Sequence, residues 1–243
     1  MRVPGVRGLV LAVQFLTRIP TPQVKDFREE DIGRSAIWFP CVGLLVGALV
    51  ATPVHLLSDR PMLAGLVGVV VWTWVTGALH LDGLGDVADA LGASHRDPAR
   101  FHEVLKDPHM GSFGVVTVVL QLLAKAVLLE EAAAHDLTWV VVLVPAWARW
   151  GSLALTRLTR SLQAGLGERF GGEVTVATIV GWAVVLTLVS ILTEPVLLVA
   201  LPIAVLAALY WHRRLGGVSG DGLGASTEVT ETLLLVALVA TTL

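Results

Sequence analysis

The chain has few charged residues for its length. Asp, Glu, Lys and Arg make up 15% of its 243 residues, whereas a soluble domain carries about 25%. The formal net charge of −3 provides no overall positive field, so nucleic acid is not an expected partner. A single cysteine excludes an intramolecular disulfide. Hydrophobic residues, by contrast, make up 55% of the chain, and the mean hydropathy is +0.76. These proportions indicate an integral membrane protein.

Seven stretches are apolar and long enough to cross a bilayer, for which a helix needs about 20 residues. They are residues 36–57, 62–81, 112–130, 138–156, 175–192, 195–211 and 225–243. The last has a short apolar part, because Glu228 and Glu231 lie in its first turns. The sequence therefore predicts an all-α, polytopic membrane helix bundle of about seven spans, built as one domain over residues 1–243.

The segment before the first span is expected to lie at the membrane surface. The stretch MRVPGVRGLVLAVQFLTRIPTP places two arginines before a short apolar core. That core is too short to span, and no cleavage site of small residues follows it, as a signal peptide would require. We therefore expect a retained interfacial helix that ends near Pro20.

The basic residues orient the predicted spans. If the N-terminus is cytoplasmic, the inner segments hold fourteen of the 17 Lys and Arg residues, and the outer loops near 58–61, 131–137 and 193–194 hold only Arg60. Loops rich in Lys and Arg stay on the cytoplasmic side of a membrane. The sequence thus predicts a multi-pass protein of the inner cell membrane with its N-terminus inside and its C-terminus outside.

Three aspartates follow the second predicted span. Asp82, Asp86 and Asp89 are spaced so that a helix would carry all of them on one narrow face. Stacked carboxylates repel one another, and Mg²⁺ relieves this repulsion because it binds carboxylate oxygens together with waters and substrate phosphates. The alternative is a solvated helix end, but this stretch contains none of the lysines that such a face usually mixes in.

A second polar element is KDPHMGSFG, residues 106–114. If it is helical, Asp107, Gly111 and Gly114 share a face on which the two glycines permit close approach of a helix or a ligand. Alternatively, Asp107 is a helix N-cap with Pro108 at the first helical position.

The third element is the glycine-rich stretch GGVSGDGLGASTE, residues 216–228. A flexible loop of this kind before a helix can direct backbone N–H groups at an anion. Asp221 within it is a candidate metal ligand, and the alternative is a connector with a capping aspartate. Both this stretch and the Asp82 cluster fall on the predicted cytoplasmic face.

Two basic residues, Lys125 and Arg149, fall within predicted spans. A charge inside the bilayer is costly, so both are expected to face the bundle. Lys125 has the alternative of extending outward toward Glu130 and Glu131. Arg149 either reaches a substrate phosphate or an acid beside the metal, or it forms an ion pair that only holds two spans together.

The order of these motifs resembles that of the cobalamin synthase family, the adenosylcobinamide-GDP ribazoletransferases. The resemblance runs over nearly the whole chain, from FLTRIPTP and WFPCVGLLVG through GALHLDGLGDVADALGA and EVLKDPHMGSFG to AGLGERF and GGVSGDGLGA. Three positions depart from the family pattern: Ala90 replaces a glycine, His109 replaces a basic residue, and Gly222 replaces a larger residue. Because of the second departure, the permanent positive charge that the family has at this position is not expected at His109.

The resemblance implies a Mg²⁺-dependent membrane enzyme whose active site faces the cytoplasm. It would join adenosylcobinamide-GDP to α-ribazole, or to α-ribazole 5′-phosphate, and release GMP in the last steps of cobalamin biosynthesis. We assign catalysis to Asp82, Asp86 and Asp89, metal binding to these three with Asp221, and substrate binding to Lys106, Asp107, Gly111, Arg149, Gly220 and Gly224. The general base, the number of metal ions, the preferred acceptor and the oligomeric state, including a homo-oligomer, stay open.

Two other functions share parts of this pattern. A CDP-alcohol phosphotransferase that forms phospholipid also uses spaced membrane aspartates, but its signature has Ala-Arg three residues after Asp-Gly and a longer aspartate spacing, both absent from DGLGDVAD. A cation transporter places ionisable groups near the bilayer midplane. Here the acids lie at span ends and the mid-span charges are basic. Metal-dependent GMP release from a corrinoid substrate would separate the three functions.

Overall fold

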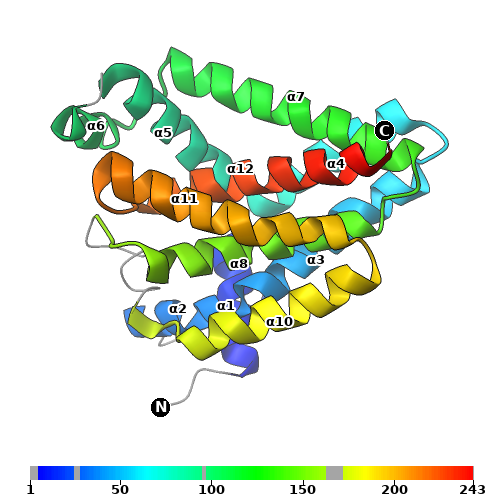
Figure 1. Cartoon of the computed structure of the whole chain (residues 1–243), viewed down its shortest axis with the longest axis horizontal. Helices are drawn as coiled ribbons and strands as arrows, with labels where there is room; N and C mark the ends of the chain where they lie inside the picture. Colours follow the sequence, from blue (N-terminus) through cyan, green and yellow to red (C-terminus); the bar gives the residue numbers. More distant parts are fainter. Residues whose placement is uncertain (1–4, 25–27, 95–96, 163–171, 243) are drawn as a thin grey trace.

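The computed structural model describes residues 5–24, 28–94, 97–162 and 172–242, and within them the chain is a bundle of helices (Figure 1). The helices are α1 (Val6–Leu16), α2 (Glu29–Ser35), α3 (Phe39–Leu56), α4 (Pro61–Thr76), α5 (Leu79–Ser94), α6 (Pro98–Val104), α7 (Ser112–Ala134), α8 (Leu143–Leu158), α10 (Val176–Leu192), α11 (Ala200–Leu215) and α12 (Gly220–Val239). In the described residues, the short 3₁₀ helices η1 (Ala36–Trp38), η2 (Val140–Val142) and η3 (Pro195–Val199) lie between α-helices, and η4 (Ala240–Thr242) follows α12. The motif AGLGERF, residues 164–170, lies outside the described residues.

Each predicted apolar segment is helical over most of its length, but fewer than seven are long enough to span. Within the described residues, four helical segments qualify by length and composition: Glu30–Leu56, Ser112–Ala134, Pro195–Leu215 and Gly220–Thr242. A fifth arises if α4 and α5 together form one broken span. The α10 segment is apolar but shorter, and α8 has only 16 residues. The all-α membrane architecture is therefore supported with four to five spanning helices, and the count of seven is not confirmed.

The second predicted span, residues 62–81, ends earlier than expected. Gly77 and Ala78 both adopt left-handed backbone conformations, with φ of 63° and 60°. Two such residues in succession cannot continue a right-handed helix. Helix α4 therefore ends at Thr76, and α5 leaves at 91° to it. Because of this bend, α5 runs across the bundle with Asp82, Asp86 and Asp89, whereas a straight continuation of α4 would carry them beyond the end of the bundle.

Helix α8 lies in the middle of the bundle and packs against α3, α10, α11 and α12; in Figure 1, α3 and α10 lie below it and α11 and α12 above it. Twelve of its 16 residues are buried. Glycines let α3 approach it closely, because a Cβ atom at Gly43 would lie 2.5 Å from the Cα atom of Ala146, and one at Gly47 would lie 2.7 Å from that of Val142. Small residues at helix contacts are typical of bundles in membranes.

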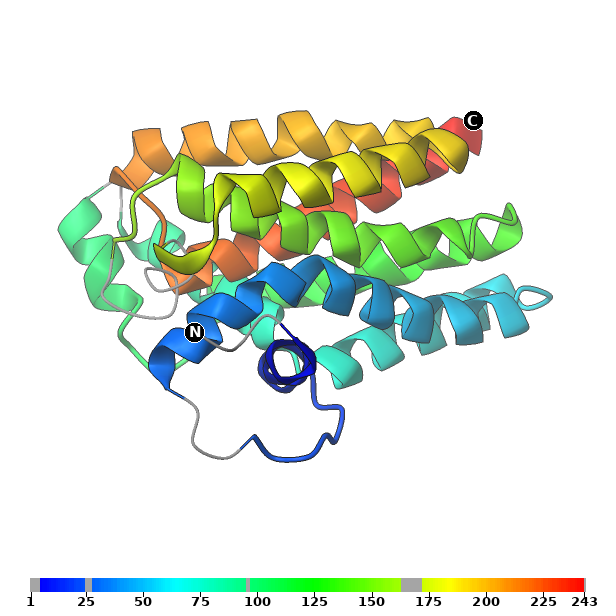
Figure 2. The ribbon, with the colours of Figure 1, turned by 90° about the horizontal axis from the view of Figure 1, so that it is seen from below.

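Helix α1 runs across the bundle. In Figure 2 the bundle helices lie roughly horizontal, whereas α1 is seen end-on. A helix perpendicular to the spanning helices has the orientation expected of an interfacial helix. It ends at Leu16, before Pro20, and Phe15 stacks on Phe39 of α3 with ring centroids 5.8 Å apart. The N-terminal helix is thus packed against the bundle.

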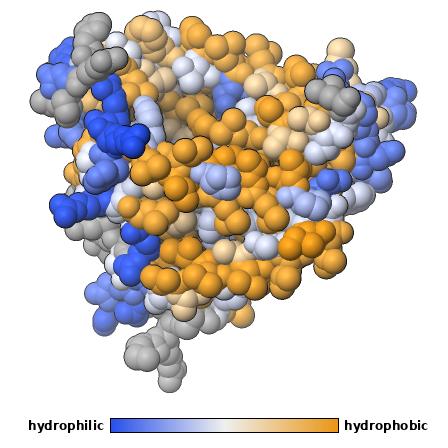
Figure 3. Space-filling model, viewed as in Figure 1, coloured by the Kyte–Doolittle hydropathy of each residue, from blue (hydrophilic) through white to orange (hydrophobic). Residues whose placement is uncertain are grey.

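The surface has the polarity of a membrane protein. Figure 3 shows an apolar belt between two hydrophilic ends. The helix ends that border the connections predicted to be cytoplasmic, namely the last turns of α5, α8 and α11 and the first turns of α7, α10 and α12, lie at one end of the bundle (left in Figures 1 and 2). The short loops after α3, α7 and α10 lie at the other end. The bundle thus separates the two predicted sets of loops.

Candidate active site

Helices α5 and α12 bring aspartates from distant parts of the chain together. A Cβ atom at Gly83 would lie only 3.0 Å from both the Cα atom and the carbonyl oxygen of Asp221. Glycine at this position therefore lets the first turn of α12 pack directly against the backbone of α5. Asp82, the neighbour of Gly83, and Asp221 consequently share one region, as the sequence predicts.

Asp82 and Asp221 line a cavity of about 230 Å³ between α1, α3, α5, α8 and α12. Arg149 lines the same cavity from α8, and so do Gly220 and Gly224 from α12. Phe15 and Phe39 form part of an apolar wall. Five of the residues predicted from the sequence thus meet in one place: Asp82, Arg149, Gly220, Asp221 and Gly224.

Asp86 lies one turn further along α5 and is half-buried. The carboxylates of Asp82, Asp221 and Asp89 are the charges that act on it. It stands beside the cavity without lining it. In the described part of the chain, no three His, Cys, Asp or Glu side chains are placed to hold one metal ion. Mg²⁺ sites, however, are commonly built from one or two carboxylates that are completed by substrate phosphates and water.

Asp89 has a different environment from the other two acids of α5. It is 9% exposed, and its carboxylate oxygens accept hydrogen bonds from the backbone N–H groups of Gly111, at 2.7 Å, and Gly114, at 2.9 Å. These groups belong to the N-terminus of α7, which attracts a negative charge. A Cβ atom at Gly111 would lie 2.6 Å from Asp89 Oδ1, so the glycines make room for this carboxylate.

Lys106 and Asp107 are exposed on the connection between α6 and α7 and do not line the cavity. The expectation that Asp107, Gly111 and Gly114 share a helical face is wrong, because α7 begins only at Ser112. Pro108 does not begin a helix either, so Asp107 is not its N-cap. Instead, Asp107 Oδ1 accepts hydrogen bonds from the backbone N–H of His109 at 3.0 Å and pairs with its Nδ1 at 2.8 Å. The bond from the His109 side chain lowers the pKa of Asp107 below its usual range.

The glycine-rich stretch is more ordered than predicted. Helix α12 already begins at Gly220, so Asp221 lies in its first turn and not in a flexible loop. Gly216 ends α11 with φ of 76°, and Val218 then forms a bridge with Ser161. Ser219 is the N-cap of α12, and its hydroxyl accepts a 3.0 Å hydrogen bond from the N–H of Gly222. The N-terminus of α12 is therefore fixed at the edge of the cavity.

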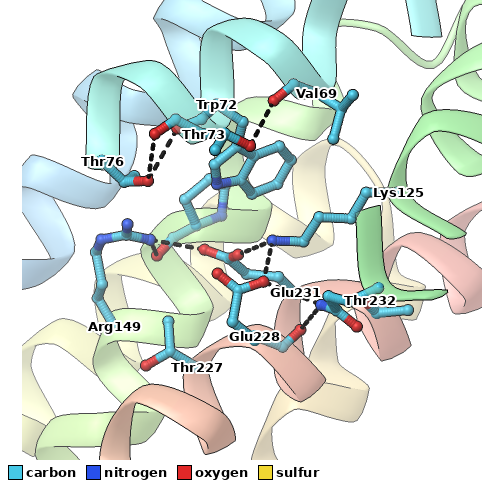
Figure 4. A network of polar contacts seen from close by, with 12 residues as sticks. Val69, Trp72, Thr73, Thr76, Lys125, Arg149, Thr227, Glu228, Glu231 and Thr232 are labelled. Carbon is cyan, nitrogen blue, oxygen red and sulfur yellow. Dashed lines mark hydrogen bonds and ion pairs between the residues drawn. The ribbon is translucent and has the colours of Figure 1, made fainter. Parts of the chain in front are cut away.

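Arg149 and Lys125 face the bundle interior, as predicted, and each is paired with acids of α12 (Figure 4). Arg149 Nη1 donates to Glu231 Oε1 at 2.8 Å. Lys125 Nζ lies 2.6 Å from Glu228 Oε2 and also bonds Glu231 Oε2. All four side chains are at least 95% buried. The alternative in which Lys125 extends outward toward Glu130 and Glu131 is therefore wrong.

Arg149 uses only part of its hydrogen-bonding capacity within the described residues. Its Nη1 also donates to the carbonyl oxygen of Pro145 at 3.1 Å. Its Nε and Nη2 atoms are buried and have no hydrogen-bond partner there. Figure 4 shows the ion pair with Glu231 on one side of the guanidinium and the other nitrogens on the opposite side. Two nitrogens of Arg149 thus have no partner among the described residues, and its side chain lines the cavity that also contains Asp82 and Asp221.

The comparison with known proteins agrees with the family resemblance that the motifs carry. The family model of cobalamin-5-phosphate synthase matches residues 8–239. The chain belongs to this family. The match to cobalamin-5-phosphate synthases covers α1 through α12, and so it includes every helix that lines the cavity.

The three relatives described next share the same functional name. The chain is 50% identical over 236 residues to an adenosylcobinamide-GDP ribazoletransferase of Thiobacillus denitrificans, with 95% of this chain and 94% of the relative covered. It is 52% identical over 248 residues to one of Laribacter hongkongensis, with 98% and 99% covered. It is 28% identical over 250 residues to one of Clostridioides difficile, with 95% and 96% covered. No solved structure matches the chain.

The sequence interpretation missed the acids that pair with the intramembrane cations. The sequence places Glu228 and Glu231 in the last span and takes them only as a sign that its apolar part is short. In the structure both residues are buried, with exposed fractions of 4% and 0%. A usable signal was present, because Lys125 and Arg149 require negative partners at span depth. The two glutamates of the last span match them in number and depth.

Proposed function

We propose that this chain is an adenosylcobinamide-GDP ribazoletransferase, which transfers the adenosylcobinamide-phosphate group to α-ribazole or its 5′-phosphate and releases GMP. Its support is the cavity in which Asp82, Asp221 and Arg149 meet, in a chain of the cobalamin-5-phosphate synthase family. Acids from facing helices beside an arginine with free donors provide the charges that a diphosphate and its metal ion need.

In the proposed reaction, a hydroxyl oxygen of the ribazole forms a bond to the phosphorus on the cobinamide side of the diphosphate. The bond from that phosphorus to the oxygen of GMP breaks, GMP leaves, and a carboxylate of the site accepts the hydroxyl proton. Arg149 binds a diphosphate oxygen through its free N–H groups. The apolar wall formed by Phe15 and Phe39 limits the access of water.

Asp82 and Asp221 would hold Mg²⁺ in this site, with Asp86 beside them. Two carboxylates at one cavity fit this ion, because it usually takes one or two protein carboxylates and completes its shell with water and phosphate. Mg²⁺ bound there neutralises charge on the diphosphate oxygens. We assign Asp89 to a supporting role, since both of its oxygens hold the start of α7 in place.

The size of the cavity determines which part of the substrate it receives. At about 230 Å³ it is smaller than the roughly 300–1,000 Å³ of typical ligand sites. It therefore holds the reacting diphosphate, while the corrin ring stays outside. We propose that the site faces the cytoplasm, with the N-terminus inside and the protein in the inner cell membrane, as the distribution of basic residues indicates.

Purified protein in lipid nanodiscs tests this function. With adenosylcobinamide-GDP and α-ribazole, we expect GMP release that requires Mg²⁺ and stops when the metal is chelated. Asp82→Asn and Asp221→Asn should each lower turnover about a hundredfold or more, because each keeps the side-chain shape and removes charge at the reacting diphosphate. Replacing α-ribazole with its 5′-phosphate in the same assay identifies the preferred acceptor.

Asp59→Asn is the matched control, because Asp59 is an exposed aspartate in the loop after α3. It should retain wild-type turnover. Wild-type protein that releases no GMP would refute the proposed activity. Near-normal turnover of both site variants at saturating Mg²⁺ would instead refute the assigned metal site.

A further inference from the structure

Glu231 joins the two buried cations of the bundle. It is 0% exposed, and its two carboxylate oxygens have different partners. Oε1 accepts from Arg149 at 2.8 Å, whereas Oε2 bonds Lys125. Because each oxygen is held by a separate cation, the carboxylate cannot rotate without losing one of the two bonds. The orientation of Glu231 is therefore fixed by α7 and α8 together.

Arg149 is close to two sets of acids. It pairs with Glu231, and it lines the same cavity as Asp82 and Asp221. A buried arginine that lacked Glu231 would be drawn toward those two aspartates, since they are the acidic residues that line its cavity. Such a turn would place a guanidinium against the carboxylates that the proposed metal ion needs.

We propose that Glu231 is a positioning residue for the transfer reaction, an inference that rests on the proposed function. By binding Nη1, it holds the guanidinium back from Asp82 and Asp221 and leaves Nε and Nη2 as a two-donor fork for an anionic phosphate oxygen. Arginine binds phosphate best through two parallel N–H groups, and Nε and Nη2 form one such pair. Glu231 touches no substrate in this scheme and acts through Arg149.

Lys125 supports the same arrangement. It lies 4.4 Å from the ring centroid of Trp72, a cation–π contact that fixes its position. It also bonds Glu228, whose side chain accepts a further 3.0 Å hydrogen bond from Gln121. Glu228 thus belongs to the same buried network but makes no contact with Arg149 among the described interactions. This difference makes Glu228 a matched control for Glu231.

The experiment compares purified Glu231→Gln, Glu228→Gln and Arg149→Lys with wild-type protein in nanodiscs. GMP release gives kcat and KM, equilibrium binding of GMP in the presence of Mg²⁺ gives Kd, and a thermal scan gives Tm. We expect Glu231→Gln and Arg149→Lys each to lower kcat/KM at least tenfold and to weaken GMP binding. Glu228→Gln should lower Tm as much as Glu231→Gln does but keep kcat/KM within about threefold of wild type.

The double variant Glu231→Gln with Arg149→Lys should be no slower than the slower single variant, because both substitutions remove the same positioned pair of N–H donors.

If Glu231→Gln does not fold, Glu231→Asp replaces it. The aspartate keeps the negative charge in the buried network but withdraws both carboxylate oxygens by one methylene group, so we expect a folded protein with lowered kcat/KM. Equal losses of kcat/KM in the Glu228 and Glu231 variants would overturn the positioning role, and so would wild-type kinetics in the Glu231 variants. A wild-type protein that releases no GMP would overturn the proposed function and this inference with it, whereas active wild-type protein with active Glu231 variants would overturn this inference only.

Discussion

Asp89 determines where α7 begins. Its carboxylate accepts two backbone hydrogen bonds at the N-terminus of that helix, where the partial positive charge favours an acid. Hydrogen bonds to a charged acceptor contribute about 1.5–3 kcal/mol each. The conformation of the chain between α6 and α7 therefore depends on a residue of α5. One aspartate of the predicted catalytic cluster thus also connects two helices.

This connection predicts the effect of a methyl group at Gly114. A Cβ atom there would lie 2.9 Å from the carbonyl oxygen of Gly85 and would also meet the Asp89 carboxylate. We expect Gly114→Ala to lower stability by about 1–3 kcal/mol through overpacking, measured as a lower Tm in detergent. Gly181→Ala in α10 is the control, because no atom lies within 4 Å of its Cβ position. Equal Tm values for the two variants would contradict this account of Gly114.

Lys125 and Arg149 show which structural features the sequence position of a single charged residue can predict. The positions of Lys125 and Arg149 within apolar runs suffice to predict that both face the interior, because lipid excludes charge. Their pairing with Glu228 and Glu231 depends on how α7, α8 and α12 pack, which no local pattern encodes. Arg149 forms the ion pair of one predicted alternative, with Glu231, and its two unpartnered nitrogens are compatible with the other alternative, a substrate phosphate.

At the scale of elements, the bend between α4 and α5 controls the site. Because α5 turns through 91°, its Gly83 meets the first turn of α12. Asp82 and Asp221 consequently face one cavity although they come from separate helices. A straight helix through residues 62–94 would have carried the aspartates out of the bundle. The left-handed pair Gly77 and Ala78 is therefore part of what assembles the site.

The contact between α5 and α12 leads to a prediction about Gly83. A methyl group at this residue, 3.0 Å from the backbone of Asp221, must push the two helices apart by a few tenths of an ångström. We expect Gly83→Ala to lower kcat/KM about tenfold and Gly83→Val to lower it further, because small misplacements of reacting groups are costly. Gly151→Ala in α8, which has no atom within 4 Å of its Cβ position, should retain activity. Full activity of Gly83→Val would show that the spacing of these helices does not matter for the reaction.

For the whole molecule, the two ends of the bundle are expected to lie on opposite sides of the membrane. Cysteine labelling tests this in a Cys41→Ala background. Lys106→Cys places an exposed thiol before α7, and Ala134→Cys places one at its last residue. An impermeant reagent added outside should label Ala134→Cys but not Lys106→Cys until the membrane is opened. Labelling of both from the same side would exclude a crossing by α7.

The sequence predicts the class of this molecule well and its three-dimensional details less well. Apolar runs and the positions of Lys and Arg suffice for an all-α membrane bundle, because the bilayer imposes these patterns directly. The motif around Asp82 predicts a candidate site, and Asp82 and Asp221 line one cavity as expected. The bend at Gly77 and the anchoring of α7 by Asp89 were not foreseen, because both arise from contacts between segments that are distant along the chain.

The pairing of α12 with α7 and α8 also has a consequence for how the protein is made. A ribosome synthesises α7 and α8 before α12, so Lys125 and Arg149 enter the membrane ahead of Glu228 and Glu231. During that interval both cations lack the acids that neutralise them, at a cost of about 2.5–3.5 kcal/mol each on insertion scales. The nascent chain is therefore least stable just before its last helix is released. Insertion of α12 then neutralises the two cations and brings Asp221 to the cavity in the same step, so a chain that stops short of α12 lacks both the acids of the buried network and one carboxylate of the candidate site.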